Sequence, residues 1–444
     1  MSDTFDFAKT SALQKRFHAL CGFDNVIVAV SGGSDSLALL HLVYRWQSDI
    51  RPPRKLRLIA VTVDHGLRTE SKLETRLVRE GGRAIGIEHR SVSWRGHKPA
   101  SAIQDAARIA RYRLLAEVTH RLPGRSVVLT GHTRDDQAET LLMRLARGSG
   151  PEGLAGIAVH TTTYGCDVSR PILDLSRSAL QDYLRSLNIE WLNDPSNEEM
   201  AFERVRVRHN GSARYALGLE DAALARTARR MARANTALDH IADQTLCDLT
   251  QQNIDLRRYG VFTWCDKCRE LPDEIAIRVL RRVIWRLGGQ GDLPALGQTE
   301  KLFADISAKG FRGATLAGCR CVPKQTGNAI QALFFRESGR AALPVLRLCA
   351  PATAIWDRRF RIKFHTSTAE AATIAAVGSN LSILRQEGAS TCPEICQIPA
   401  EILRTLPGLY VGNELVAAPS LGWGLPGHQI EAEFVVQKLI CDRA

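Results

Sequence analysis

Apolar and polar positions divide the first half of the chain into two kinds of segment that follow each other in turn. Short apolar runs rich in β-branched residues predict buried strands, at 26–30, 56–63, 87–92 and 126–130. The stretches around them carry apolar residues at helical spacing and predict helices, at 8–22, 37–44, 71–85, 101–121 and 133–147. Strands that alternate with helices in this way predict a parallel, doubly wound α/β sheet.

The second half of the chain has a different pattern. Apolar residues recur at helical spacing over three stretches, which predicts a helical domain, at 212–249, 274–287 and 298–308. After residue 311, short apolar runs divided by Gly and Pro predict a small mixed α/β or mostly β domain, with examples at 330–335 and 409–416. We therefore expect three domains, at 1–205, 206–310 and 311–444.

Composition narrows the class of protein. The 444 residues include 59 Lys and Arg against 47 Asp and Glu, a formal net charge of +12. This balance favours a polyanionic partner, although many basic proteins have none. No apolar run is long enough for a signal peptide or a bilayer span, so we expect a cytoplasmic protein without membrane contact. Eleven scattered cysteines fit free thiols in a reducing compartment better than disulfides, and their irregular spacing argues against zinc.

The first predicted strand leads into a glycine-rich loop, SGGSDS at 31–36, and then into a helix. Two glycines allow positive φ and let successive N–H groups face one concavity, beside the positive end of the helix dipole. A phosphate group suits such a site, whereas the plainer interpretation is a well-capped βα turn. The spacing matches neither GxxxxGK[ST] nor GxGxxG. The candidate phosphate-binding residues are Ser31, Gly32, Gly33, Ser34, Asp35 and Ser36.

A second group of candidates follows the predicted strand at 126–130, in GHTRDDQAET at 131–140. On a helix, the carboxylates of Asp136 and Glu139 lie about one turn apart, near the helix start. Acidic residues there often only favour the helix dipole. However, this helix and the SGGSDS loop both begin where parallel strands end, and Mg²⁺, which often accompanies bound phosphate groups, takes oxygen ligands. Leu141, Leu142 and Leu145 are predicted to form the buried face of the helix.

The loop resembles the PP-loop of the N-type ATP pyrophosphatases, which split ATP between its α- and β-phosphates. Seven motifs between about residues 20 and 210 occur in the order and spacing of the tRNA(Ile)-lysidine synthetase family. They are SGGSDS (31–36), TVDHGLR (62–68), AARIARY (106–112), GHTRDDQAET (131–140), RGSGPEGLAG (147–156), RPILDLSR (170–177) and WLNDPSN (191–197). The resemblance implies an adenine nucleotide alpha hydrolase-like fold for the first domain, and it is thin beyond these motifs.

The resemblance also implies an activity. Such an enzyme uses ATP and Mg²⁺ to join free L-lysine to C2 of the wobble cytidine in the CAU anticodon of tRNA(Ile), through an adenylated base. Asp35 is then the first candidate for the metal, with Asp136 and Glu139 beside it. Lysine arrives as an ammonium ion and must lose a proton to a base. Asp64, His65 and His132 are the candidates by position, and the sequence does not choose among them.

Several arginines are candidates for contact with tRNA or ATP phosphates, although arginines on a helix surface are often only solvated. They are Arg111, Arg113, Arg204, Arg206 and Arg208. The family commonly has Arg-Asn-x-x-Arg where this chain has Arg204-Val205-Arg206-Val207-Arg208, so the contact made by that asparagine is in doubt. The flipped base could stack on Trp94 or Tyr112.

Three other functions stay open at this point. A PP-loop tRNA thiolase would adenylate the same oxygen and then install sulfur, but no cysteine lies between Cys21 and Cys166. A tRNA-binding protein without activity could keep a relict loop, although the acidic and serine positions of SGGSDS are intact. A synthetase that amidates small molecules would not need the positive charge. A homodimer is also left open.

Overall fold

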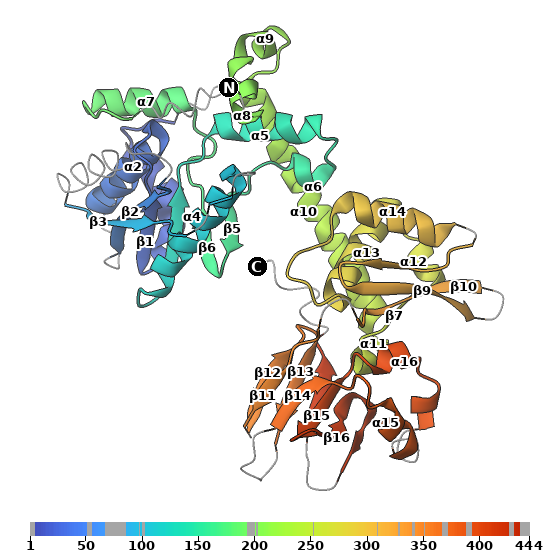
Figure 1. The fold of residues 1–444 in the computed structure, drawn as a ribbon. Helices are drawn as coiled ribbons and strands as arrows, with labels where there is room; N and C mark the ends of the chain where they lie inside the picture. Colours follow the sequence, from blue (N-terminus) through green and yellow to red (C-terminus); the bar gives the residue numbers. More distant parts are fainter. Residues whose placement is uncertain are drawn as a thin grey trace. The chain divides into compact units, whose positions relative to one another are not determined.

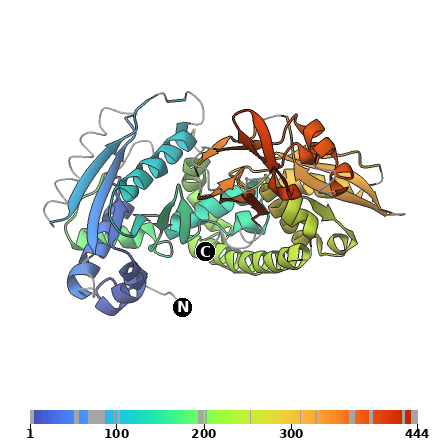
Figure 2. The same cartoon turned by 90° about the horizontal axis from the view of Figure 1, so that it is seen from below.

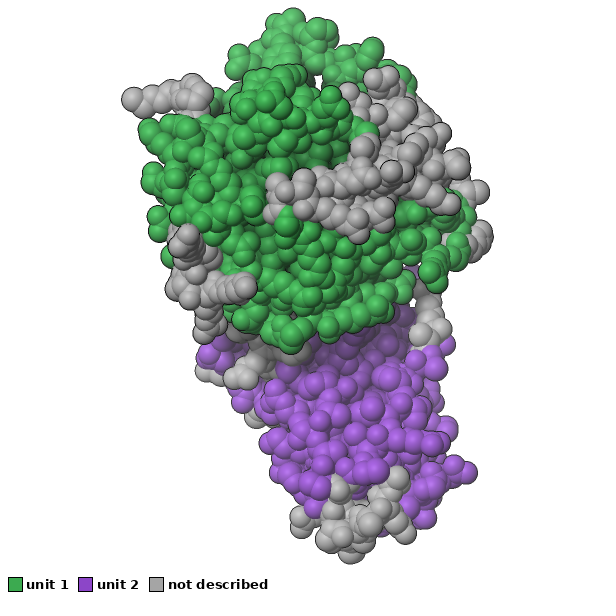
Figure 3. Space-filling model, turned by 90° about the vertical axis from the view of Figure 1, so that its left-hand side faces the viewer, with its two compact units in different colours: residues 1–235 green, residues 236–444 purple. Residues whose placement is uncertain are grey.

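The computed structural model describes most of the chain, in two compact units at 1–235 and 236–444 (Figure 3). The described residues are 5–50, 56–66, 86–96, 98–99, 103–192, 200, 203–251, 253–308, 310–326, 329–339, 342–349, 351–365, 372–387, 393–425 and 430–435. The predicted domain boundaries at 205 and 310 fall inside these units. The first of them lies within the helix α8, Glu203–His209.

The first unit contains a six-stranded sheet with the strand order β3-β2-β1-β4-β6-β5 (Figure 1). Its strands are β1 Asn25–Ala29, β2 Arg57–Asp64, β3 Glu88–Ser93, β4 Ser126–Thr130, β5 His160–Thr163 and β6 Cys166–Ser169. All neighbours pair in parallel except β5 with β6. The four predicted strands are confirmed, as is a mostly parallel sheet with β1 and β4 at its centre, whereas the edge strands β5 and β6 were not predicted.

Successive residues of β1 contact two separate hydrophobic cores. Val26 and Val28 pack with residues of the N-terminal helix and of the helix after β1. Ile27 and Ala29 pack instead with Tyr112 and other residues of the helix before β4. Side chains of a strand alternate between the two faces, so the sheet is covered by helices on both sides. The doubly wound arrangement is therefore confirmed.

The predicted helices at 8–22, 37–44, 101–121 and 133–147 are confirmed, whereas the helices between residues 151 and 209 were not predicted. The helices of this unit are α1 Thr10–Phe17, the 3-10 helix η1 His18–Gly22, α2 Ser34–Ile50, α4 Ile103–His120, α5 Arg134–Ala146, α6 Pro151–Leu154, α7 Arg177–Ser186, α8 and α9 Gly211–Ala216. The helix predicted at 71–85 lies outside the described residues. In α5, Leu141 is buried and Leu142 is half-buried, but Leu145 is 57% exposed. The prediction that Leu145 is buried was wrong, because the last turn of α5 extends past the neighbouring core.

A single helix of 31 residues, α10 Asp221–Gln251, begins in the first unit and continues into the second (Figure 2). Its arginines Arg226, Arg229, Arg230 and Arg233 are exposed. In the second unit, Asp239 Oδ1 accepts from Arg278 at 2.8 Å and from Arg282 at 2.6 Å. These half-buried ion pairs hold α10 to α13 Asp273–Leu287. No helix among the described residues has both the length and the apolar character needed to cross a membrane.

The second unit combines helices with three antiparallel sheets, as predicted for a helical middle followed by strands. The sheets have the orders β7-β10-β9-β8, β11-β14-β15-β16-β17 and β12-β13-β18. The strands are β7 Phe262–Trp264, β8 Ala314–Leu316, β9 Cys319–Thr326, β10 Ala329–Arg336, β11 Leu346–Leu348, β12 Ala352–Trp356, β13 Phe360–Phe364, β14 Ala372–Ala376, β15 Pro407–Val411, β16 Glu414–Ala418, β17 Trp423–Gly424 and β18 Ile430–Phe434. The apolar run at 409–416 forms a hairpin that turns at Gly412, where φ is +60°.

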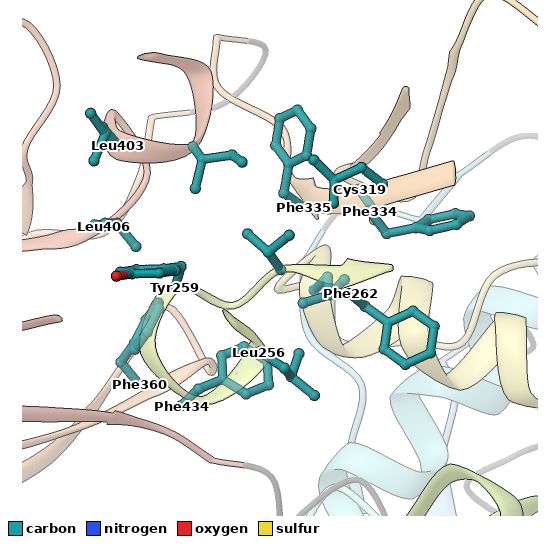
Figure 4. Close-up of a cluster of buried hydrophobic side chains, with 14 of the residues drawn as sticks. Leu256, Tyr259, Phe262, Cys319, Phe334, Phe335, Phe360, Leu403, Leu406 and Phe434 are labelled. Atoms are coloured by element: carbon teal, nitrogen blue, oxygen red, sulfur yellow. The ribbon is translucent and has the colours of Figure 1, made fainter. Parts of the chain in front are cut away.

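One hydrophobic core joins the helices and strands of this unit. Its other helices are α11 Ile254–Tyr259, α12 Asp266–Arg269, α14 Leu296–Ser307, α15 Leu381–Glu387, η3 Pro393–Cys396, α16 Ala400–Leu403 and η4 Pro419–Leu421. Figure 4 shows Phe360 and Phe434 beside Leu256 and Tyr259 of α11. The rings of Phe360 and Phe434 meet edge to face with centroids 5.6 Å apart. This packing explains why residues 236–444 form a single unit.

Candidate functional site

The SGGSDS loop lies between the end of β1 and the start of α2, as predicted. Gly32 has a φ of +87°, a value that side chains rarely permit. Ser36 Oγ accepts from the N–H of Ser31 at 3.2 Å and donates to the carbonyl of Gly33 at 3.0 Å. The N–H of Leu192 donates to the carbonyl of Gly32 at 3.0 Å. Internal hydrogen bonds therefore hold the loop in one shape.

These bonds use hydroxyls, carbonyls and the N–H of Ser31. Within the described part of the chain, the N–H groups of Gly32, Gly33 and Ser34 have no hydrogen-bond acceptor. They lie directly before the first turn of α2, where the helix dipole places partial positive charge. The loop can therefore offer several N–H donors to an anion such as a phosphate group.

Two of the predicted metal ligands face a common arginine. Arg177, the first residue of α7, donates from Nε to Asp35 Oδ2 at 2.9 Å. Its Nη2 lies 3.5 Å from Asp136 Oδ1. Arg177 lies 142 positions after Asp35 and is not among the site residues predicted from the sequence. The only signal for it was its position as the last residue of the RPILDLSR motif.

The second oxygen of each carboxylate has a partner of its own. Asp35 Oδ1 accepts from Ser34 Oγ at 3.0 Å. Asp136 Oδ2 accepts from the N–H of Thr133 at 2.8 Å and from its Oγ1 at 3.0 Å. Thr133 and Asp136 thus form a capping box at the start of α5. The box orients Asp136 so that Oδ1 points toward Arg177.

Burial and charge shift the pKa values of this group in different directions. Burial raises the pKa of Asp35 above its usual value, against the opposing effect of Arg177, and the nearby Asp136 raises it further. For Asp136, burial is outweighed by Arg177, His132 and the N–H of Thr133, so its pKa is lowered. Burial disfavours the charge of Arg177, but Asp35 and Asp136 raise its pKa overall. The arginine is therefore a firmly charged partner of both carboxylates.

Glu139, the third predicted metal ligand, is paired with two arginines of α8. Arg208 donates to it twice, from Nε to Oε1 at 2.8 Å and from Nη2 to Oε2 at 3.2 Å. Arg204 Nε lies 3.5 Å from Oε2. Burial raises the pKa of Glu139 despite Arg208. The structure therefore shows Arg204 and Arg208, both predicted to contact phosphate, in contact with a buried carboxylate.

The other residues of this segment have different surroundings. Arg206 is exposed and donates to the carbonyl of Met200 at 3.1 Å, so of the three arginines it is the one turned to solvent. Val205, which replaces the family asparagine, is buried in the core of the first unit. An apolar side chain fits this place because burial of an unpaired amide is costly.

Carboxylates are suitable ligands for Mg²⁺, but these three are not grouped around one point. Among the residues that the structure describes, no three His, Cys, Asp or Glu side chains are grouped so that they could hold a metal ion. The predicted set of Asp35, Asp136 and Glu139 is thus not preassembled. Mg²⁺ commonly binds through one or two carboxylates together with substrate phosphates and water. Asp35 and Asp136, which each turn one oxygen to Arg177, fit that kind of site.

The three candidate bases lie at the ends of two strands, β2 and β4, which flank β1 in the sheet. Asp64 Oδ1 accepts from the N–H of Gly66 at 2.7 Å and shapes the turn after β2. His65 packs edge to face against Trp94, and its buried Nδ1 has no partner within the described residues. Burial lowers the pKa of His65, and Arg111 lowers it further.

His132 follows β4, and its Nδ1 is 2.8 Å from Thr130 Oγ1. Burial lowers the pKa of His132 to about 3, although the nearby Asp136 acts in the opposite direction. The imidazole is therefore neutral at pH 7, and Asp136 is its anionic neighbour. Of the three candidates, it is the one that interacts with a predicted metal ligand.

The predicted arginines of α4 and the two predicted aromatic residues, Tyr112 of α4 and Trp94 after β3, differ in their exposure. Arg113 is exposed, whereas Arg111 is half-buried and close enough to affect the pKa of both His65 and His132. Tyr112 is buried in the sheet core with the guanidinium of Arg108 over its ring, so the interpretation of Tyr112 as a base-stacking residue was wrong. Trp94 is half-buried, and it stays a candidate.

The chain resembles known proteins over most of its length. Residues 8–212 match the family described as the PP-loop domain. A tRNA(Ile)-lysidine synthase of Bradyrhizobium sp. (strain BTAi1) is 45% identical over 296 residues, which cover 66% of this chain and 80% of the relative. A second, of Ruegeria pomeroyi, is 36% identical over 402 residues, 89% of this chain and 88% of the relative. A third, of Brucella canis, is 36% identical over 423 residues, 93% and 90% of the two chains.

The similarity in sequence thus extends from the SGGSDS loop and its carboxylates into the second unit. Sequence identities of 36–45% indicate a common family and not only a common fold. The similarity includes the whole segment that holds the PP-loop, Arg177 and Glu139. The loop geometry and these relatives lead to one assignment: the chain belongs to the tRNA(Ile)-lysidine synthase family.

Proposed function

We propose that this protein joins lysine to C2 of the wobble cytidine in the CAU anticodon of tRNA(Ile), with cleavage of ATP to AMP and pyrophosphate. The names of its relatives support this function, as does the PP-loop match. The observation that carries it is the set of N–H groups at Gly32, Gly33 and Ser34, which the described protein leaves for an anion. A cytoplasmic location follows from the proposed tRNA substrate.

The reaction has two steps in this proposal. The O2 atom of the cytosine attacks the α-phosphorus of ATP, and the bond to the bridging oxygen breaks, so that pyrophosphate leaves. The lysine ε-amine then attacks C2, the C2–O2 bond breaks, and AMP leaves with that oxygen. The amine gives up its protons during the second step.

Residues of the first unit have separate roles in the first step. The N–H groups of Gly32, Gly33 and Ser34 hold the departing pyrophosphate, whose negative charge grows next to fixed dipoles. Asp35 and Asp136 would hold Mg²⁺, which supplies positive charge to the phosphate oxygens. Asp136 affects the pKa of both His132 and Glu139, so both lie near it.

We assign orientation of the lysine ε-amine to His132, and the proton passes to solvent water. The His132 ring is neutral at pH 7, with a pKa of about 3, so it can accept a hydrogen bond from the amine but is a weak acceptor for the proton itself. Asp64 is engaged in the turn to Gly66, and His65 lies against Trp94. We assign Trp94, which lies beside His65 directly after β3, to stacking on the flipped base.

Exposed arginines supply the surface for the tRNA backbone in this proposal. Arg113 and Arg206 are exposed in the first unit. Four more are exposed on α10, namely Arg226, Arg229, Arg230 and Arg233. Contacts of arginine with phosphate position a nucleic acid without reading its sequence. The excess of positive charge, +12, fits this role.

The test is a reaction of the purified protein with ATP, labelled lysine and unmodified tRNA transcripts. We expect label in tRNA(Ile) with the CAU anticodon and equal amounts of AMP and pyrophosphate. The Asp35→Asn variant should still bind tRNA but release little pyrophosphate. Release of ADP, a product that needs a sulfur donor, or transfer of lysine to no RNA at all would overturn the proposal.

A further inference from the structure

Arg177 takes up the oxygens that a metal ion would need. Its Nε bonds to Asp35 Oδ2 at 2.9 Å, and its Nη2 lies 3.5 Å from Asp136 Oδ1. The opposite oxygens accept from Ser34 and Thr133. A cation that binds Asp35 Oδ2 and Asp136 Oδ1 therefore competes with the guanidinium for these two oxygens.

The backbone of Arg177 is held independently of its side chain. Its N–H donates to Asp135 Oδ2 at 2.9 Å, and the preceding Ser176 caps α7 through a bond to the N–H of Ala179 at 3.3 Å. The N–H of Arg134 donates to the carbonyl of Leu175 at 2.8 Å, which ties this turn to the start of α5. The side chain can therefore change partner while the main chain stays in place.

The three side chains are also exposed enough for Arg177 to change its partner. The side chains of Arg177, Asp35 and Asp136 are 23%, 17% and 11% exposed. A guanidinium matches the oxygens of a phosphate as well as those of a carboxylate, because its planar donors form paired hydrogen bonds with either. Asp35 is also the second residue of the helix that follows the phosphate-binding loop, so the alternative partner is close.

We propose that Arg177 neutralises Asp35 and Asp136 while the site holds no nucleotide, and that its guanidinium moves to a phosphoryl group when ATP and Mg²⁺ enter. The arginine thereby excludes free metal from the site and then contributes to nucleotide binding. Arg177 is thus a positioning residue for the metal and a binding residue for ATP. This inference rests on the proposed function only in taking ATP and Mg²⁺ as the ligands.

The proposal predicts effects of opposite sign in one variant. Without the guanidinium, Arg177→Gln leaves two carboxylates facing each other, so Mn²⁺ alone should bind about tenfold more tightly than to the wild type. The complex of Mg²⁺ with a non-hydrolysable ATP analogue should bind about tenfold more weakly, because the phosphoryl contact is lost. Electron paramagnetic resonance of free Mn²⁺ measures the first affinity, and calorimetry measures the second.

Two further variants separate exchange from a purely structural role. Arg177→Lys keeps the charge but not the paired donors, so Mn²⁺ binding should stay weak while affinity for the nucleotide falls. Arg121→Gln removes an arginine from an exposed pair with Glu117 and should change neither affinity. Circular dichroism establishes that each variant is folded, and the lysine variant carries the test if Arg177→Gln does not fold.

Three results would overturn the inference. They are unchanged or weaker Mn²⁺ binding to folded Arg177→Gln, full nucleotide affinity in Arg177→Lys, and tight Mn²⁺ binding to the wild type without nucleotide. Each is distinct from failure of the proposed function. A wild-type protein that binds ATP and Mg²⁺ but puts no lysine into tRNA refutes the function and leaves these binding measurements interpretable.

Discussion

Gly131 packs so closely against the first turn of α2 that a Cβ atom on it would lie 2.9 Å from the carbonyl carbon of Asp35. The same Cβ would be 2.9 Å from the nitrogen of Ser36. Gly131 follows β4 directly, so this contact joins the two segments that carry the phosphate-binding loop and the carboxylates. The absence of a side chain at Gly131 sets the distance between them.

The variant Gly131→Ala should therefore distort the site. Backbone atoms of α2 cannot yield as a flexible side chain would, so the new methyl group must push the two segments apart. We expect the free energy of unfolding to fall by about 1–3 kcal/mol. We also expect release of pyrophosphate to drop more than tRNA binding does. Urea unfolding and a pyrophosphate assay measure the two effects.

Gly22→Ala provides the control for this prediction. No atom lies within 4 Å of a Cβ built at Gly22, and its φ is not positive, so this change should be nearly neutral. Equal effects of the two substitutions would show that the close approach to α2 does not limit the site.

The low pKa of His132 predicts how stability depends on pH. The folded protein binds a proton at His132 only near its pKa of about 3, whereas the unfolded chain binds one near 6.5. Between these values the unfolded state holds more protons, so the free energy of unfolding falls as the pH falls, by up to about 1.4 kcal/mol per pH unit for this group. His132→Asn removes that contribution, and its stability should decline less steeply from pH 6.5 to pH 4.

Denaturant unfolding at a series of pH values measures this difference. His240→Asn, at an exposed position of α10, should keep the slope of the wild type. A parallel loss of stability in His132→Asn and the wild type would mean that the unprotonated imidazole is not maintained in the folded state.

Arg208→Met should destabilise the first unit through Glu139. The change removes two hydrogen bonds to a carboxylate that is 3% exposed and leaves Arg204 at 3.5 Å as its remaining ion pair. We expect a loss of about 1–3 kcal/mol in the free energy of unfolding. The pKa of Glu139 should rise further, because Arg208 is a cause that lowers it.

Arg206→Met is the matched control, since Arg206 lies on the same helix and is exposed. It should weaken tRNA binding and leave stability within about 0.5 kcal/mol of the wild type. Thermal and urea unfolding compare the two variants, and filter binding measures tRNA. A larger loss of stability in Arg206→Met than in Arg208→Met contradicts the assignment of these side chains.

Local sequence patterns predicted the elements of the first unit well because burial determines them locally. The apolar run that became β1 lies at the centre of the sheet and packs on both sides, so every position in it is apolar. The conformation of the SGGSDS loop could also be predicted, because it depends on the backbone of its own glycines and on hydrogen bonds between residues of the loop. The position of each predicted strand end then followed from the parallel topology.

Side-chain pairing could not be read in the same way. Arg204 and Arg208 are four residues apart and share a helix face, but their partner Glu139 is more than 60 positions earlier. Arg177 and Asp35 are separated by 142 positions. Nothing in the local pattern distinguishes an arginine that meets a buried carboxylate from one that meets solvent. The prediction for Leu145 was wrong for a related reason. Helical spacing predicts which face of α5 is apolar, but it does not predict how far along the helix the neighbouring core extends.

The capping box of α5 has a consequence for the choice of ion. Because Thr133 binds one oxygen of Asp136 and Ser34 binds one of Asp35, each carboxylate can offer a cation a single oxygen. Calcium favours six to eight oxygen ligands and often both oxygens of a carboxylate, whereas magnesium retains several of its own waters. By favouring a single oxygen from each carboxylate, Thr133 and Ser34 fit the coordination of magnesium better than that of calcium.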